Sequence, residues 1–244
     1  NGIWFSNNSA FWTKTDGSLW SWGSNNYGQL GQNNKTQYSS PKQVGTDTTW
    51  GTGDGKIGSW SQAAIAIKTD GTLWSWGRNN DKKITSASPD NTHISSPRQV
   101  GTDTDWEKVS SGGSSAFLIK TDGTLWAQGH NEYGTLGNNS TTNQSSPIQI
   151  PGTTWATVAV AGQSGSNVIA TKTDGTLWSW GQNDSGSLGL NQGEPAQRSS
   201  PAQVPGTTWT TNWASIKRGN KYNAMASKTD GTLWIWGDNS SGQF

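Results

Sequence analysis

The chain contains no cysteine, so disulfide bonds, thiolate nucleophiles and cysteine zinc sites are excluded from its 244 residues. Neither sign of charge predominates, since 17 Lys and Arg residues and 16 Asp and Glu residues give a net charge of +1. Such a balance does not draw a protein onto nucleic acid or an anionic membrane. No apolar run approaches the roughly 18 residues that a transmembrane helix needs. We therefore expect no nucleic-acid partner and no membrane insertion.

Large aliphatic residues are scarce, and hydrophobic residues of all kinds make up only 29% of the chain. A composition this polar is typical of disorder when the net charge is high, which is not the case here. The chain instead contains 17 tryptophans. Each buried Trp removes about 150–250 Å² of surface from water. The composition therefore predicts a folded protein with an aromatic core.

One ten-residue phrase, Lys-Thr-Asp-Gly-Thr-Leu-Trp-Ser-Trp-Gly, stands at 68–77 and again at 172–181. Close copies begin at Lys14, Lys120 and Lys228, and the aspartates of the five copies are 52–56 residues apart. Two further markers keep the same order. They are Ser-Ser-Pro, at Pro41, Pro97, Pro147 and Pro201, and a Trp after a Gly/Thr-rich turn, at Trp50, Trp106, Trp155 and Trp209. The period predicts five repeats, with approximate limits 1–31, 32–85, 86–137, 138–189 and 190–244.

Each copy of the phrase predicts a β-hairpin, because an Asp-Gly pair lies between two runs of strand-forming residues. We expect a type I′ turn there, with positive φ at both central residues. Two more extended runs, such as Ser-Ser-Pro-Lys-Gln-Val at 39–44 and Trp-Glu-Lys-Val-Ser-Ser-Gly at 106–112, bring each unit to about four strands. The proline suits an edge strand. No helical period is present.

Four-stranded units of this length with a Trp-Gly signature indicate the blades of a β-propeller. A four-stranded sheet with two apolar faces cannot bury both faces alone, whereas radial packing buries each face on a neighbour. The sequence therefore predicts an all-β fold of four-stranded antiparallel blades, with residues 1–244 forming a single propeller domain.

The string Leu-Trp-Ser-Trp-Gly-Ser-Asn-Asn-Tyr-Gly-Gln-Leu-Gly at 19–31, followed by Ser-Ser-Pro-Lys-Gln-Val, resembles the repeat of the regulator of chromosome condensation family. The resemblance extends over the whole chain, and the wording Lys-Thr-Asp-Gly-Thr-Leu-Trp is similar to that of bacterial and phage members. It implies a propeller, usually of seven blades. We expect either a five-bladed ring with a reduced closing blade or, preferably, five units of a longer chain.

Three units depart from this pattern. In the second, Lys82 and Thr85 replace the two glycines of Gly-Gln-Leu-Gly. In the third, Gln128 replaces the second Trp of the phrase, and in the fifth Phe244 takes the Leu position. We expect surface chemistry to differ among blades at these positions.

No residue set predicts catalysis, a cofactor or a metal site. The two histidines, His93 and His130, lie in different loops without a partner motif. Asp103 and Asp105 lack the flanking ligands and glycine of a calcium loop. No nucleophile, base and orienting group can be named together. We therefore expect a non-enzymatic protein.

Most tryptophans recur at fixed positions, which favours core packing, but Trp60 and Trp213 lie off the markers. These two are candidate exposed anchors, and Trp213 has basic and aromatic neighbours. Tyr27 and Tyr133 occupy equivalent loop positions. The predicted partner-contact residues are therefore Trp60, Trp213, Lys217, Arg218, Tyr222, Tyr27 and Tyr133.

The features point first to a structural or recognition propeller displayed on a surface, either on a virion (a phage fibre or capsid decoration) or as a cell-surface adhesin module. Its partners would be other protein subunits or a host-surface receptor, with possible assembly into a larger particle, and its location extracellular or on the virion. The alternative is an inhibitor module resembling the propeller-type β-lactamase inhibitors, whose exposed rim aromatics would bind a protein. A lectin, or a guanine-nucleotide exchange factor like the founding family members, fits less well. The blade loops are unequal, and the basic tail and blade insertion on which exchange depends are lacking.

Overall fold

The computed structural model describes residues 2–5, 8–60, 62–79, 93–160, 167–191, 197–212, 216–218, 222–242 and 244. Within them the chain forms five antiparallel sheets in sequence order, here called sheets I to V. Sheet I contains β1 (Gly2–Phe5), β2 (Ser9–Thr13), β3 (Leu19–Gly23) and β4 (Tyr38–Gln43). Sheet II contains β5 (Ile57–Trp60), β6 (Ala63–Ile67), β7 (Leu73–Gly77) and β8 (Ile94–Gln99).

Sheet III contains β9 (Trp106–Gly112), β10 (Ser115–Lys120), β11 (Leu125–Gly129) and β12 (Gln144–Gln149). Sheet IV contains β13 (Trp155–Val160), β14 (Asn167–Lys172), β15 (Leu177–Gln182) and β16 (Gln197–Val204), with the short 3-10 turn η2 (Asp184–Gly186). Sheet V contains β17 (Ile216–Arg218), β18 (Asn223–Ser227) and β19 (Leu233–Gly237), and its described residues include no fourth strand.

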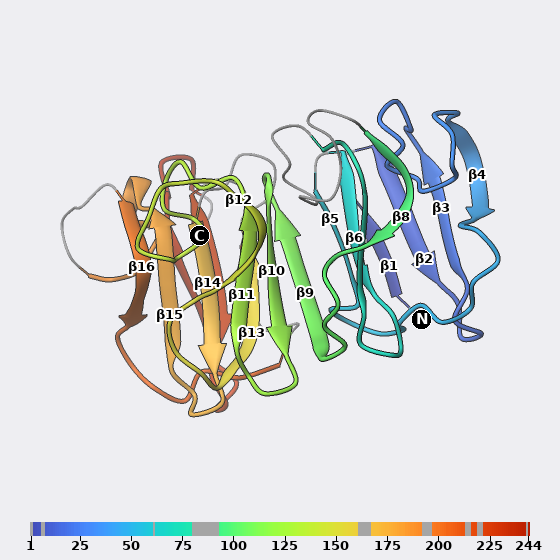
Figure 1. The fold of residues 1–244 in the computed structure, drawn as a ribbon. Coiled ribbons are helices and arrows are strands. Elements are labelled where there is room, and N and C mark those ends of the chain that lie inside the picture. The colour runs from blue at the N-terminus through green and yellow to red at the C-terminus, as the bar shows by residue number, and fades with distance from the viewer. Residues whose placement is uncertain are drawn as a thin grey trace.

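The sheets pack as the blades of a propeller, as the sequence predicted. The first strand of each sheet lies against the first strand of the next, from β1 through β5, β9 and β13 to β17. The fourth strands form the opposite edges, and the Ser-Ser-Pro prolines lie in them as expected of edge strands. Figure 1 shows the sheets in order from the N-terminal sheet (blue) to the C-terminal strands (orange to red).

The predicted hairpins are confirmed, but the predicted turn type is wrong. In the second copy, Gly71 N–H donates to the Lys68 carbonyl and Lys68 N–H donates to the Thr72 carbonyl, each at 3.0 Å. Gly71 has a φ of 78°, whereas Asp70 is not among the positive-φ residues. The loop therefore has three residues, with a type I turn followed by one left-handed glycine, and not the two left-handed residues of a type I′ turn.

The aspartate of each turn organises the tryptophan that follows it. Asp70 Oδ1 accepts hydrogen bonds from the Thr72 backbone N–H at 3.0 Å and from its hydroxyl at 2.7 Å. Thr72 Oγ1 in turn accepts from Trp74 Nε1 at 2.8 Å. The other four copies have the same chain of bonds, ending at Trp20, Trp126, Trp178 and Trp234. Hydrogen bonds from this hydroxyl and N–H lower the pKa of all five aspartates.

The lysine of each phrase lies over two aromatic rings. In sheet III, Lys120 Nζ is 4.7 Å from the ring centroid of Trp106 and 5.0 Å from that of Trp126. Lys68, Lys172 and Lys228 lie over equivalent pairs, whereas Lys14 lies over Trp20 of its own phrase and Trp12 of β2. Cation–π attraction therefore joins the phrase to the Trp marker, and this explains why the repeat retains a basic residue at that position.

The second Trp of the phrase packs against a loop of the preceding sheet. Trp76 Nε1 donates to the Gln29 carbonyl at 2.8 Å, and Trp180 Nε1 donates to the Thr135 carbonyl at 2.7 Å. Both indoles are fully buried. A Cβ on Gly31, the last glycine of the first loop, would lie 3.0 Å from Trp76 Nε1, so this loop position has room for glycine alone.

The junction between sheets II and III lacks both members of this pair. Gln128 replaces the Trp, and Thr85 replaces the last loop glycine. Residues 80–92 lie outside the described residues, but Gln128 itself is fully buried. In the sequence, Thr85 replaces the loop glycine ahead of the sheet in which Gln128 replaces the indole.

The two ends of the blade series expose apolar faces. Leu19, Leu73, Leu125 and Leu177 are fully buried by the next sheet, whereas the equivalent Leu233 is 61% exposed. At the other end Ile3 and Phe5 are 56% and 73% exposed, although Val109, which is equivalent to Ile3, is buried. The outer faces of sheets I and V therefore lack the cover that every internal face has.

The sheets and the predicted sequence repeats differ in phase by one strand. The predicted repeats end at the Gly-x-Leu-Gly loop, whereas each complete sheet continues through its Ser-Ser-Pro strand.

No helix in the described part of the chain is long and apolar enough to cross a membrane. The number of blades in the native ring stays a prediction.

Candidate protein-binding groove beside the last strand

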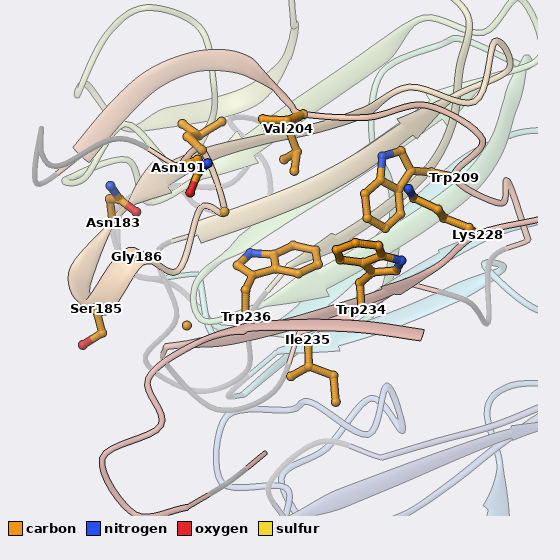
Figure 2. A pocket seen from close by; sticks show the side chains of 14 residues that line it. Asn183, Ser185, Gly186, Asn191, Val204, Trp209, Lys228, Trp234, Ile235 and Trp236 are labelled. Atoms are coloured by element: carbon orange, nitrogen blue, oxygen red, sulfur yellow. The ribbon is translucent and has the colours of Figure 1, made fainter. Parts of the chain in front are cut away.

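A groove of about 720 Å³ lies between sheets IV and V. Figure 2 shows Trp234 and Trp236 of β19 on one side, with Trp209 and Lys228 beside them and Val204 and Asn191 across the space. Ile235 points to the opposite face of β19, as strand alternation requires. Aromatic side chains and loops of sheets IV and V thus line one open cleft.

The groove is larger than its counterpart beside sheet III. The corresponding groove beside sheet III measures about 400 Å³, and its lining includes Ser145, Ser146 and Pro147 of β12. In the described residues β19 pairs with β18 on one side and with no strand on the other. The side chain of Trp234 is 50% exposed, whereas its counterparts in sheets I to IV are less exposed.

Among the described residues Lys228 has no ion-pair partner, like Lys14 and Lys172 and unlike Lys68 and Lys120. Lys68 pairs with Asp47, and Lys120 pairs with Asp103 at 2.7 Å and Asp105 at 3.0 Å. These aspartates belong to the turn before the Trp marker. The turns before Trp155 and Trp209 read Pro-Gly-Thr-Thr and have no acidic residue. No carboxylate among the described residues pairs with Lys228.

The ion pairs of the earlier blades shift the pKa values of their members. Partial burial alone would raise the pKa of Asp47, but hydrogen bonds from Lys68 and Thr49 lower it to about 2. For Lys120, burial would lower the pKa, and its bonds to Asp103 and Asp105 raise it. Asp103 and Asp105 thus both pair with the ammonium group of Lys120.

A second donor lies beside Lys228. Trp209 is only 3% exposed, and its Nε1 has no hydrogen-bond partner among the described residues. A Cβ on Gly206 would lie 3.7 Å from Lys228 Nζ and 3.8 Å from Trp209 Nε1, so the two donors converge on one point at this glycine. A carboxylate that enters the groove can pair with Lys228, as Asp47 pairs with Lys68 and Asp103 with Lys120.

The expectation that Trp60 is exposed is wrong. Trp60 is 6% exposed at the end of β5 and packs with Trp106, Val109 and Ala116 between sheets II and III. The small side chain of Ala63, its partner across the strand pair, leaves space for the ring. Trp60 is therefore a core residue and offers a partner no surface.

The other predicted contact residues that the structure describes are distributed over sheets I, III and V. Trp213 falls outside the described residues, and Lys217 and Arg218 lie in β17, where only their backbone is described. Tyr222, just before β18, is half-buried. Tyr27 and Tyr133 are half-buried in equivalent loops of sheets I and III. Their role in binding stays a prediction.

Tyr27 belongs to a small basic cluster at the loop end of sheets I and II. Its ring is 4.9 Å from the His93 ring in edge-to-face geometry, and the Arg78 guanidinium lies 5.2 Å from its centroid. Burial lowers the pKa of His93, and the charges of Lys35 and Arg78 lower it further. His93, expected as an exposed residue without a partner, is therefore half-buried on an aromatic ring.

Sequence reasoning missed Trp209, Lys228 and Trp234 as a site. The signals were the fifth unit without a following Ser-Ser-Pro segment and the turn without an aspartate. Within the described residues no three His, Asp or Glu side chains cluster as a metal site would require.

The family model described as "Regulator of chromosome condensation (RCC1) repeat" matches residues 16–55, 122–169 and 174–225, more than half of the chain. The chain belongs to this family. The chain is 26% identical to the human E3 ubiquitin-protein ligase HERC2 over 75% of its own length, but spans 4% of that protein. It is 23% identical to the Arabidopsis thaliana ultraviolet-B receptor UVR8, covering 92% of the chain and 50% of the receptor.

Among solved structures, human WBSCR16 has a TM-score of 0.73 at 20% identity, over 90% of this chain and 56% of that chain. Yeast Prp20p has a TM-score of 0.54 at 15% identity, over 97% of this chain and 71% of that chain. These likenesses establish the RCC1-type β-propeller fold, a protein-interaction fold. The ligase and receptor names belong to proteins of which this chain spans at most half.

Proposed function

We propose that the chain is a non-enzymatic recognition propeller that binds an extended segment of another protein in the groove between sheets IV and V. The observation that carries this proposal is the cleft itself, which is lined by three tryptophans and by a lysine that pairs with no carboxylate among the described residues. Such a cleft offers an incoming segment aromatic surface and one charged group.

The groove has the composition of a protein-binding hot spot. Trp residues dominate such sites because they bury a large area with few rotamers. Lys228 adds a preference for an acidic side chain or a chain terminus, since it pairs with no carboxylate among the described residues. Binding there would be weakened by salt, because the attraction of Lys228 for the carboxylate is screened.

A peptide library displayed without sequence bias tests this proposal. The chain should enrich extended peptides, and the double variant Trp234→Ser, Lys228→Met should lose them while retaining the wild-type circular dichroism spectrum. As a matched control, Lys14→Met changes the equivalent lysine of sheet I and should leave binding unchanged. Peptides that bind both variants equally would refute the groove as the site.

We further propose that the propeller is displayed on a surface, as a virion module or a cell-surface adhesin, with protein subunits or a host receptor as partners. The support comes from the sequence, which is free of cysteine, nearly neutral, and rich in Ser, Thr, Asn and Gly. Mass spectrometry of purified particles and of fractionated cells from the natural source checks this. Peptides from this chain should appear in the particle or surface fraction, and confinement to the cytosol would contradict it.

A second candidate function is an inhibitor module that binds through its loop rim. The packing of Tyr27 between Arg78 and His93 favours it, because a rigidly held Tyr loses little entropy on binding. If this is the function, Tyr27→Ala and Tyr133→Ala should abolish binding of the partner while groove variants leave it intact.

A further inference from the structure

We infer that sheet IV carries a binding site for a carboxylate, formed by the ammonium group of Lys172 and the indole N–H of Trp155 beside Gly152. This lysine site lies on an internal sheet with a neighbouring sheet on each side. None of its three residues lines the groove between sheets IV and V, so the inference goes beyond the proposed function. The ligand is a free small carboxylate or an acidic side chain of a partner protein, since both offer the same group.

The repeat itself contains two examples of a carboxylate held in this way. In sheet II, Asp47 pairs with Lys68. In sheet III, Asp103 Oδ2 lies 2.7 Å from Lys120 Nζ. Each aspartate stands three residues before the marker Trp, and each lysine lies over the marker Trp and the first Trp of the phrase. A lysine on two indole rings therefore accepts a carboxylate, which these two sheets supply from their own turns.

In sheet IV a glycine stands where the aspartate would be. The residue three positions before Trp155 is Gly152, and the turn is shorter by one residue, spanning 151–154 where that of sheet II spans 45–49. Gly152 has a φ of 99°, a conformation that is strained for residues with a side chain. The turn thus supplies no carboxylate, and its backbone disfavours an aspartate at this position.

The lysine of sheet IV keeps its place on the two rings. Lys172 Nζ is 4.8 Å from the ring centroid of Trp155 and 4.6 Å from that of Trp178. No carboxylate among the described residues forms an ion pair with it. Asp174 of the same phrase accepts hydrogen bonds from Thr176, as its equivalents do in every blade. Lys172 is therefore a half-buried cation whose counter-charge the described part of the chain does not provide.

A second donor borders the same space. Trp155 is 2% exposed, and its Nε1 has no hydrogen-bond partner among the described residues. A Cβ on Gly152 would lie 3.2 Å from Lys172 Nζ and 3.6 Å from Trp155 Nε1. Gly152 itself is exposed, so the space beside it opens to solvent. An anion that enters there meets both donors within a short distance.

The two donors fit a carboxylate better than other anions. One ammonium group offsets one negative charge, whereas a phosphate dianion would bring a second charge without a cation. The indole N–H of Trp50 and of Trp106 also lacks a partner, so the aspartates of sheets II and III pair with the lysine alone. A carboxylate that is not tethered to the turn can accept from the lysine with one oxygen and from the indole with the other.

The test follows the indole N–H resonances of the 244-residue chain, labelled at tryptophan, by NMR during titration with sodium acetate at constant ionic strength. The Trp155 resonance, assigned by its loss in Trp155→Phe, should shift saturably, with half-saturation near about 10 mM. Acetamide has the same shape without the charge and should cause no saturable shift. Lys172→Met should weaken acetate binding about tenfold or more.

Sheet II provides the matched control. The Trp50 resonance should not respond to acetate in the wild-type chain, because Asp47 already pairs with the neighbouring lysine. Asp47→Gly places in sheet II the residue that sheet IV has, and it should make Trp50 sensitive to acetate while Trp155 responds as before. This gain of a site keeps the test decisive if Lys172→Met does not fold.

A blocked tripeptide, Thr-Asp-Thr, distinguishes the two sources of the carboxylate. Tighter binding of the tripeptide than of acetate supports an acidic side chain of a partner protein, and equal affinity supports a free carboxylate. The inference is overturned if acetate does not shift Trp155, if acetamide shifts it equally, or if Lys172→Met leaves the titration unchanged. The groove between sheets IV and V is tested separately, by variants of Trp234 and Lys228.

Discussion

Trp180 donates its indole N–H to the Thr135 carbonyl at 2.7 Å, and the same nitrogen would lie 2.7 Å from a Cβ on Gly137. The glycine of one blade is therefore dictated by the tryptophan of the next. Gly189 and Trp236 repeat this relationship between sheets IV and V, with 2.7 Å between the added Cβ and the indole nitrogen.

Gly137→Ala should therefore destabilise the chain through both its φ of 73° and the contact with Trp180. We expect a loss of about 2–4 kcal/mol in the free energy of unfolding, from backbone strain and overpacking together. In a Trp180→Gln background the steric part should vanish, giving a coupling of about 1–3 kcal/mol. Denaturant unfolding of the four proteins of the cycle measures this.

Gly101→Ala provides the control, since Gly101 has a φ of 68° but nothing within 4 Å of an added Cβ. It should cost only the backbone part, about 1 kcal/mol. Equal losses for Gly101→Ala and Gly137→Ala would show that the indole does not constrain the loop.

The uncovered outer face of sheet V predicts that Leu→Ala at the same motif position lowers the free energy of unfolding by different amounts in sheets III and V. Leu125→Ala should lower the free energy of unfolding by about 2–5 kcal/mol, because Leu125 is fully buried between blades. Leu233→Ala removes the same side chain from the same motif position, where it is 61% exposed, and should cost less than about 1 kcal/mol. A large loss for Leu233→Ala would show that another part of the protein covers this face.

The turn aspartates predict a loss of stability in acid. Hydrogen bonds from the following Thr or Ser lower the pKa of Asp16, Asp70, Asp122, Asp174 and Asp230 below 3.8. Because the pKa is lower in the folded state, the stabilisation is present above the unfolded pKa and is lost as pH falls through the folded value. The melting temperature should therefore fall between about pH 4 and pH 2.

Asp47 should contribute to the same acid transition, since its pKa is about 2. Asp47→Asn removes this titration and leaves Lys68 with its two tryptophans alone, so the variant should be less stable at pH 7 and less sensitive to acid. Thermal unfolding at pH 2, 4 and 7 compares it with wild type. An unchanged difference between pH 4 and pH 2 would count against the Asp47–Lys68 pair as a source of the transition.

The Lys-Thr-Asp-Gly-Thr-Leu-Trp phrase predicted its hairpins because local turn chemistry and strand propensity agree there. The turn type was wrong because an Asp-Gly pair occurs both in two-residue loops and, with a left-handed glycine, in three-residue loops. The lysine over two rings could not be predicted, since one of the rings belongs to the Trp marker, 14–19 residues earlier in the sequence.

The site depends on contacts between neighbouring blades, which the repeat pattern of one blade does not predict. Gln128 and Thr85 were noticed separately as departures, and only the packing of Trp76 and Trp180 on the preceding loops relates them. Trp60 lies off the repeat positions, and position in the pattern did not indicate that Ala63 and Ala116 leave it a buried space. The groove beside β19 required knowing which strand is last in its sheet.

Hydrogen exchange of the 244-residue chain, read by mass spectrometry, tests the central claim that the groove beside β19 is accessible to a partner. The segment Leu233–Gly237 should exchange part of its amides quickly, because alternate N–H groups have no strand to donate to, while the equivalent Leu73–Gly77 and Leu177–Gly181 should exchange slowly. Slow exchange throughout 233–237, matching the internal third strands, would contradict the account, because the edge would then be covered and the groove closed.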